Sequence, residues 1–121
     1  MTETFHRALP AVDLADQQSV AGIVTDWPVL VARQGDDLFA VINRCTHAAA
    51  ALAGGRVRRG AVICPLHGAR FQLATGKCMG GQNYRDLMTF PLRLGDDGWI
   101  EVAVPDQKPG PEHMPVQTQF S

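Results

Sequence analysis

The sequence predicts an all-β domain. Apolar residues occur in short alternating or β-branched runs, and turns rich in Gly and Asp separate these runs. Helical periodicity is weak, because its best stretch, residues 12–20, is short and equally compatible with a turn. A chain of 121 residues accommodates one domain with a sizeable core, which argues against a large multi-lobed enzyme.

The first half of the chain contains three expected long strands. The first spans residues 19–25, where Val and Ile recur. Residues 28–33 and 38–43 are both rich in Val, Leu and Ala, and the sequence Gln-Gly-Asp-Asp at 34–37 lies between them. Two such runs around a Gly-containing turn predict a β-hairpin.

The second half contains shorter expected strands and a second hairpin. Residues 61–63 and 70–72 are each expected to form a short strand. Residues 88–94 and 99–104 flank Gly-Asp-Asp-Gly at 95–98, which predicts another hairpin. On these strand patterns lie three large aromatic residues that we expect to fill the core: Trp27, Phe90 and Trp99.

The C-terminal stretch has a different composition. Residues 105–121 include four prolines and lack the alternation of a hairpin, so we expect a tail without a core of its own. We therefore predict a single domain over residues 1–104 and a Pro-rich tail over residues 105–121.

Composition and charge narrow the class of protein. The formal net charge of −1 argues against binding to nucleic acid or to a membrane surface, since both reward a basic excess. The first ten residues do not resemble a signal peptide, and no apolar run is long enough to span a bilayer. We therefore expect a cytoplasmic protein. Three widely spaced cysteines do not form a disulfide framework, and in a reducing compartment they are metal ligands or small buried side chains.

Two short motifs carry metal-binding residue types. Cys45-Thr46-His47 and Cys64-Pro-Leu-His67-Gly each pair one thiolate donor with one imidazole donor directly after a strand-like run. Structural zinc accepts such a set, although zinc motifs usually group the two cysteines together and the two histidines together. A two-iron cluster can take both cysteines on one iron and both histidines on the other, which suits the interleaved order better.

The remaining candidates are weaker. Cys78 lies outside both motifs, and we expect a small buried side chain there. His6 and His113 lie toward the chain ends without neighbouring cysteines, and we expect both on the surface.

In spacing and flanking residues, the two motifs resemble the Rieske [2Fe-2S] family over about residues 19–104. The resemblance implies a six-to-ten-stranded antiparallel sandwich or barrel as a base, with a cluster-binding subdomain inserted at about residues 44–85. It implies a [2Fe-2S] cofactor whose inner iron is held by Cys45 and Cys64 and whose outer iron is held by His47 and His67.

This sequence departs from the high-potential members of that family. They carry a loop disulfide where this chain has Ala50 and Leu66, and serine and tyrosine where it has Ala69 and Phe71. Hydroxyl donors to the cluster sulfurs stabilise the reduced state, so their loss lowers the potential. We therefore expect a midpoint at the low end of the Rieske range, on the order of −150 mV.

Charge is segregated along the chain. Residues 38–85 contain seven basic residues and no acidic residue, whereas the remainder contains four basic and twelve acidic residues. We expect the basic segment to face acidic surfaces of redox partners, with steering that weakens as salt rises.

Among Rieske proteins, the sequence favours a free-standing ferredoxin. A quinol-oxidising subunit would need a membrane anchor and the loop disulfide, and a terminal oxygenase would need a second domain for mononuclear iron. The resemblance then implies an electron carrier that is not itself an enzyme. It would act between an NAD(P)H-dependent flavoprotein reductase and a terminal aromatic ring-hydroxylating oxygenase. We expect the protein to be a monomer. A small Rieske-type subunit of another reductase, such as nitrite reductase, is the alternative in the redox class, and a zinc-stapled interaction module is the alternative outside it.

Overall fold

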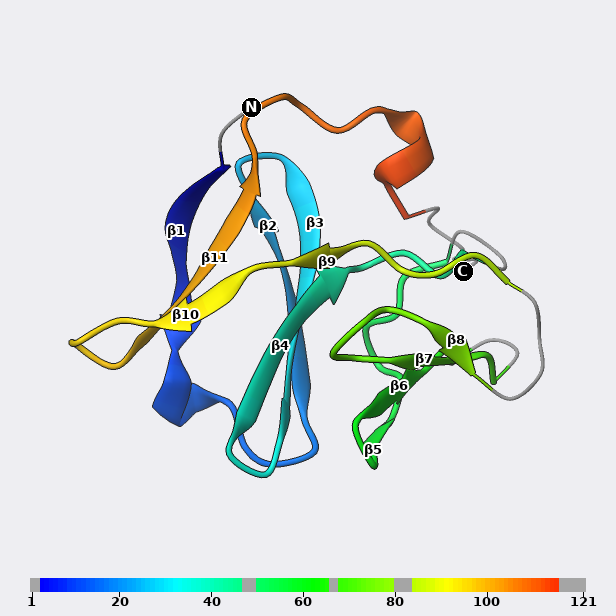
Figure 1. The fold of residues 1–121 in the computed structure, drawn as a ribbon, viewed down its shortest axis with the longest axis horizontal. Coiled ribbons are helices and arrows are strands. Elements are labelled where there is room, and N and C mark those ends of the chain that lie inside the picture. The colour runs from blue at the N-terminus through cyan, green and yellow to red at the C-terminus, as the bar shows by residue number, and fades with distance from the viewer. Residues whose placement is uncertain (1–2, 47–49, 66–67, 80–83, 116–121) are drawn as a thin grey trace, which may run out of the picture.

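The computed structural model describes residues 3–46, 50–65, 68–79 and 84–115 (Figure 1). These residues form eleven β-strands, all paired antiparallel in three sheets, and two 3-10 turns. The all-β prediction is confirmed, with one strand more than the largest number expected. The turns are η1 (Ala11–Asp13) and η2 (Pro111–His113).

Two of the sheets form a sandwich, which we call the base. Its first sheet has the order β1-β11-β10 and its second the order β2-β3-β4-β9. The third sheet, with the order β5-β6-β7-β8, lies to one side of the base (Figure 1), and we call it the small sheet. The base strands are β1 (Glu3–Pro10), β2 (Ser19–Val24), β3 (Trp27–Gln34), β4 (Asp37–Ile42), β9 (Thr89–Phe90), β10 (Leu92–Leu94) and β11 (Trp99–Pro105). The small-sheet strands are β5 (Val57–Arg58), β6 (Ala61–Ile63), β7 (Arg70–Gln72) and β8 (Cys78–Met79).

The first predicted hairpin is present. Gln34 pairs with Asp37, so Gly35 and Asp36 form a two-residue turn, and Gly35 has a φ of 63°. A second two-residue turn, at Thr25 and Asp26, joins β2 to β3 with φ values of 43° and 77°. The strand predicted over residues 19–25 therefore ends one residue earlier, at Val24, because Thr25 belongs to the turn.

The prediction of one strand over residues 88–94 is wrong in one respect. The stretch divides at Pro91 into β9, which pairs with β4, and β10, which pairs with β11. Proline has no N–H group, so the ladder cannot continue through it. The chain therefore crosses from one sheet of the base to the other at this residue.

Three strands were not predicted from the sequence. β1 forms an edge of the base and pairs along the whole of β11, with an irregularity between Arg7 and Leu9. β5 and β8 have only two residues each, which is too short for a recognisable alternation. The weak helical stretch at residues 12–20 contributes only the end of η1 before the chain continues to β2.

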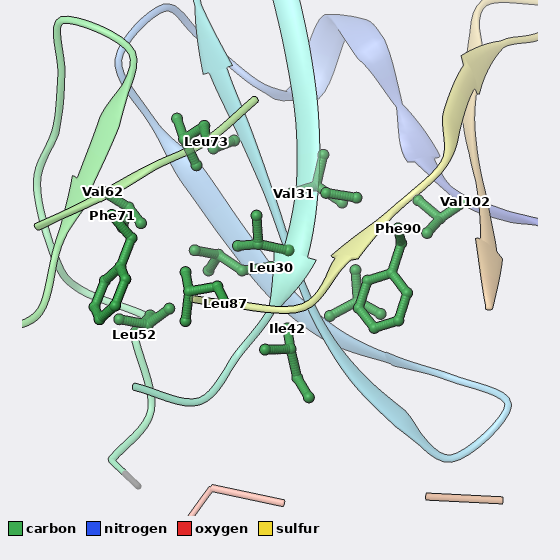
Figure 2. Close-up of a cluster of buried hydrophobic side chains, with 14 of the residues drawn as sticks. Leu30, Val31, Ile42, Leu52, Val62, Phe71, Leu73, Leu87, Phe90 and Val102 are labelled. Atoms are coloured by element: carbon green, nitrogen blue, oxygen red, sulfur yellow. The ribbon is translucent and has the colours of Figure 1, made fainter. Parts of the chain in front are cut away.

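The core is continuous between the base and the small sheet. Because successive side chains of a strand alternate between faces, the complete burial of Trp27 to Ala32 in β3 requires cover on both of its faces. Figure 2 shows Leu30 pointing toward Leu52 and Leu87, with Val62 and Phe71 of the small sheet beyond them. Burying such side chains contributes about 1.5–3 kcal/mol each, so base and small sheet stabilise each other.

Two of the three aromatic residues expected in the core are buried. Trp27 is 1% exposed and Phe90 is 5% exposed, and their rings meet edge to face with centroids 5.9 Å apart. Trp99 is only half-buried, and the guanidinium of Arg7 lies 4.4 Å from its ring centroid. The expectation for Trp99 was therefore wrong, because its strand lies in a sheet whose outer face is open to solvent.

The small sheet is inserted between two strands that pair with each other. Ala40 and Val41 of β4 pair with Phe90 and Thr89 of β9, and the Ile42 N–H donates to the Met88 carbonyl at 2.9 Å. Residues 43–88 therefore leave the base sheet and return to the same place in it.

The described part of the C-terminal stretch lies against the base. The indole Nε1 of Trp27 donates to the Gln107 carbonyl at 2.9 Å, and the Trp27 and His113 rings have centroids 4.9 Å apart. Further along, the Arg44 Nε donates to the Met114 carbonyl at 3.1 Å. His113 is accordingly half-buried, not on the surface as expected, and His6 is also half-buried.

Candidate metal centre

The two motif cysteines lie in matched loops. Cys45 lies just after β4 and Cys64 directly follows β6, and the two residues are 0% and 1% exposed. The N–H of Cys45 donates to the Ala50 carbonyl and the N–H of Cys64 donates to the Ala69 carbonyl, both at 2.7 Å. Each loop is thus closed by the same bond to the carbonyl five residues downstream.

The first loop is fixed at both ends. The buried Asn43 side chain accepts hydrogen bonds through Oδ1 from the backbone N–H groups of Leu52 at 2.8 Å and Ala53 at 3.0 Å. Directly after Cys45, the Thr46 hydroxyl donates to the Arg85 carbonyl at 2.6 Å. The loop is therefore attached to its own return segment and to the chain that follows the small sheet.

The second loop depends on glycine geometry. Gly68 has a φ of 74° and its N–H donates to the Cys64 carbonyl at 3.0 Å, which closes a tight turn. On the neighbouring segment, a Cβ at Gly55 would lie 2.0 Å from the Ile63 carbonyl oxygen. The backbone before Cys64 therefore packs against Gly55 at a distance that no other residue permits.

Buried apolar residues occupy positions in and directly after the two cysteine loops. Ala50, Ala69 and Phe71 stand where hydroxyl or disulfide groups occur in the high-potential subgroup, and they are 3%, 0% and 0% exposed. None of these side chains has a hydroxyl group, so they provide burial and no hydrogen-bond donor.

Two of the four predicted ligands, His47 and His67, lie outside the described residues, as does Leu66. Within the described residues, no group of three or more His, Cys, Asp or Glu side chains is placed to hold a metal ion. The ligand set therefore stays a prediction. The donor chemistry is nevertheless suited to iron-sulfur binding, because two buried thiols occupy matched loops and each loop carries an imidazole residue in its sequence.

Cys78 is separate from these loops. It lies in β8 opposite Phe71, is half-buried and not fully buried as expected, and is not bridged to another cysteine. Its N–H donates to Asp86 Oδ1 at 3.3 Å. Cys78 therefore lies in an edge strand of the small sheet.

Comparison with known families decides the identity of the domain. The model of the Rieske [2Fe-2S] domain matches residues 4–91. The chain belongs to the Rieske [2Fe-2S] domain family. The resemblance in the two cysteine-histidine motifs is thereby confirmed, and the match begins in β1, well before the start at residue 19 expected from the motifs.

Rieske proteins of similar size are among its relatives. The ferredoxin subunit of anthranilate 1,2-dioxygenase from Burkholderia cepacia is 34% identical over 97 residues, which cover 79% of this chain and 89% of the relative. A chain of the complex of reduced oxygenase and oxidised ferredoxin in carbazole 1,9a-dioxygenase superposes with a TM-score of 0.75 at 27% identity, covering 82% of this chain and 92% of that one.

A further Rieske-fold neighbour comes from a different system. An NADH-dependent nitrite reductase small subunit from Mycobacterium tuberculosis has a TM-score of 0.79 at 23% identity, with 88% of this chain and 100% of that chain covered. At this identity the likeness concerns the fold alone. In the described part of this Rieske chain, no helix is long and apolar enough to cross a membrane.

One structural residue of the Rieske site was not predicted. Asn43 holds the first cysteine loop, yet in the sequence it is only the last residue of an expected strand. A polar residue at the end of an expected strand, two positions before a metal-binding motif, could have marked it, because a buried side chain must satisfy its polar atoms.

Proposed function

We propose that this Rieske protein is a ferredoxin that carries single electrons from an NAD(P)H-dependent flavoprotein reductase to a terminal aromatic ring-hydroxylating oxygenase. The observation that carries the proposal is the match to a dioxygenase ferredoxin subunit over 89% of that subunit's length. The likeness to a chain of the carbazole dioxygenase oxygenase–ferredoxin complex also supports an oxygenase as the acceptor. As an electron carrier, the protein itself performs no substrate chemistry.

The proposed ligand set comprises Cys45 and Cys64 for one iron and His47 and His67 for the other. When bound, a [2Fe-2S] cluster of this kind accepts and releases one electron at a time. The chain's own contribution is to keep the two thiols out of water, since both are 1% exposed or less. The apolar alanine and phenylalanine side chains beside them favour the low potential expected from the sequence.

The domain boundaries are part of the proposal. Residues 44–85 form the cluster-binding subdomain and residues 1–104 the single domain, while residues 105–121 form the C-terminal tail. The direct pairing of β4 with β9 supports the first boundary pair, because the inserted segment begins and ends there. We place the protein in the cytoplasm as a monomer, without nucleic-acid or membrane partners.

The nitrite reductase small subunit is the second candidate, favoured by fold likeness alone.

Two measurements test the proposal. The first is chemical analysis, which should find about two iron atoms and two acid-labile sulfides per chain, together with EPR of the reduced protein. A colourless zinc protein would refute the Rieske centre. Cys45→Ser and His67→Ala should each abolish the native spectrum.

The second measurement concerns electron delivery. The dithionite-reduced protein should be reoxidised by the terminal oxygenase of the anthranilate 1,2-dioxygenase system much faster than by a nitrite reductase catalytic subunit. The opposite preference would assign the chain to the second candidate.

A further inference from the structure

The outer face of the small sheet has a distinct composition. The cross-strand pairs place Val57, Val62 and Phe71 on one face, and all three are buried. Since neighbouring residues of a strand point to opposite faces, the other face carries Arg58 and the row formed by Ile63, Arg70 and Met79. Apolar and basic side chains therefore alternate across three strands.

A groove of about 420 Å³ lies on this face. Ile63 and Met79 are half-buried, whereas the arginines that line the groove (Arg58, Arg59 and Arg70) are exposed. We call it the arginine groove, and its lining residues are Arg58, Arg59, Ala61, Ile63, Arg70 and Met79.

The arginines of the groove have no counter-charge within the described structure. Among the described residues, no hydrogen bond or ion pair joins the side chains of Arg58, Arg59 or Arg70 to any acceptor. Residues 38–85 contain no acidic residue at all. Three guanidinium groups around one groove repel each other, and an external set of carboxylates would relieve that repulsion.

The groove is also close to the proposed cluster ligands in the chain. Ile63 directly precedes Cys64, and Arg70 directly follows Ala69, whose carbonyl closes the Cys64 loop. A protein bound in the groove would therefore contact the strands that carry both ends of the second loop.

We propose that the arginine groove docks an acidic segment of the terminal oxygenase, with carboxylates on the arginines and an apolar side chain on Ile63 and Met79. This inference rests on the proposed function. Charge complementarity supports an acidic occupant, and the apolar floor favours a protein segment over a small anion. The likeness to a chain of a ferredoxin–oxygenase complex supports the oxygenase as the source.

Two double variants with equal changes in net charge test the proposal. Arg58→Glu/Arg70→Glu reverses two charges in the groove. Lys77→Glu/Lys108→Glu reverses two exposed charges that do not line it. Both full-length proteins are reduced with dithionite, and the transfer of one electron to the oxygenase of the anthranilate 1,2-dioxygenase system is followed by stopped flow at low and high salt.

We expect the groove variant to react at least about tenfold more slowly at low salt, with a smaller difference at high salt, and the control to change less than about twofold. Unchanged visible and EPR spectra in both variants establish that each retains its fold. Equal slowing of both variants would assign the effect to overall charge and overturn the groove. Slowing only with the reductase, or phosphate binding that the groove variant loses, would assign the groove to another occupant.

The parent protein separates the two levels of inference. If the parent transfers no electrons to the oxygenase although dithionite reduces it, the proposed function fails, and the docking proposal fails with it. If the parent transfers electrons and the groove variant does so equally fast, only the docking proposal fails.

Discussion

Asn43 is the residue whose replacement gives the clearest test of how the first cysteine loop is held. Its Oδ1 is the acceptor for two backbone N–H groups at the end of that loop, those of Leu52 and Ala53. Asn43→Ala removes the acceptor, and no other side chain accepts from these groups in the described structure. The loop that contains Cys45 then loses its attachment to the end of β4.

The expected cost differs for the two groups. The Leu52 N–H is buried, so leaving it without an acceptor costs about 1–3 kcal/mol. Ala53 is exposed, so water can replace the lost acceptor and only the net value of the bond is lost, about 0.5–1.5 kcal/mol. The sum is about 1.5–4.5 kcal/mol, which lowers the melting temperature of a domain of this size by about 6–18 °C at about 4 °C per kcal/mol.

Thermal unfolding by circular dichroism, with iron content per chain, measures this loss. Asn43→Asp is the matched control, because it keeps an oxygen at Oδ1 and should lose less than half as much stability. Equal destabilisation by both substitutions would show that the acceptor is not the cause. An Asn43→Ala protein with parental melting temperature and full iron content would refute the reasoning altogether.

Three further outcomes follow from the structure. Gly55→Ala should unfold the protein or abolish cluster binding, since its Cβ would meet a backbone oxygen at 2.0 Å, whereas Gly54→Ala meets nothing within 4 Å and should cost only about 1–2 kcal/mol for its positive φ, as measured by urea unfolding. Truncation after Val104 should leave the visible spectrum intact and cost about 1–2 kcal/mol through the lost bond and packing of Trp27; loss of the spectrum would contradict the tail assignment. A redox titration should give a midpoint on the order of −150 mV that rises in Phe71→Tyr, and a strongly positive parental midpoint would contradict the expectation.

Local signals in the sequence were sufficient for the long base strands. The hairpin around Gly35 follows from two β-branched runs and one glycine, and both of its strands are within one residue of the expected bounds. The cysteine-histidine motifs likewise identified the family, because their spacing is a property of the chain alone.

Features that depend on distant residues were not predictable in the same way. Pro91 divides residues 88–94 because the two halves pair with different strands. β11 follows closely in the predicted hairpin, whereas β4 lies far away in the sequence. The Thr25-Asp26 turn lacks the glycine that normally marks positive φ, so pairing of β2 with β3 must impose it. Asn43 holds the first cysteine loop only because the backbone N–H groups of residues 52 and 53 donate to its side chain.

The topology explains how the charges of this nearly neutral chain come to be separated. The stretch without acidic residues, 38–85, nearly coincides with the segment between β4 and β9, so all seven of its basic residues belong to the inserted part. Eleven of the twelve acidic residues then belong to the base and the C-terminal stretch, and Asp86 lies near the end of the inserted part. A net charge near zero limits indiscriminate binding to charged polymers, while the separation gives the molecule a dipole. An approaching acidic partner is therefore oriented toward the cysteine-bearing part of the protein and away from the base. Salt screens this electrostatic orientation at distances longer than the Debye length.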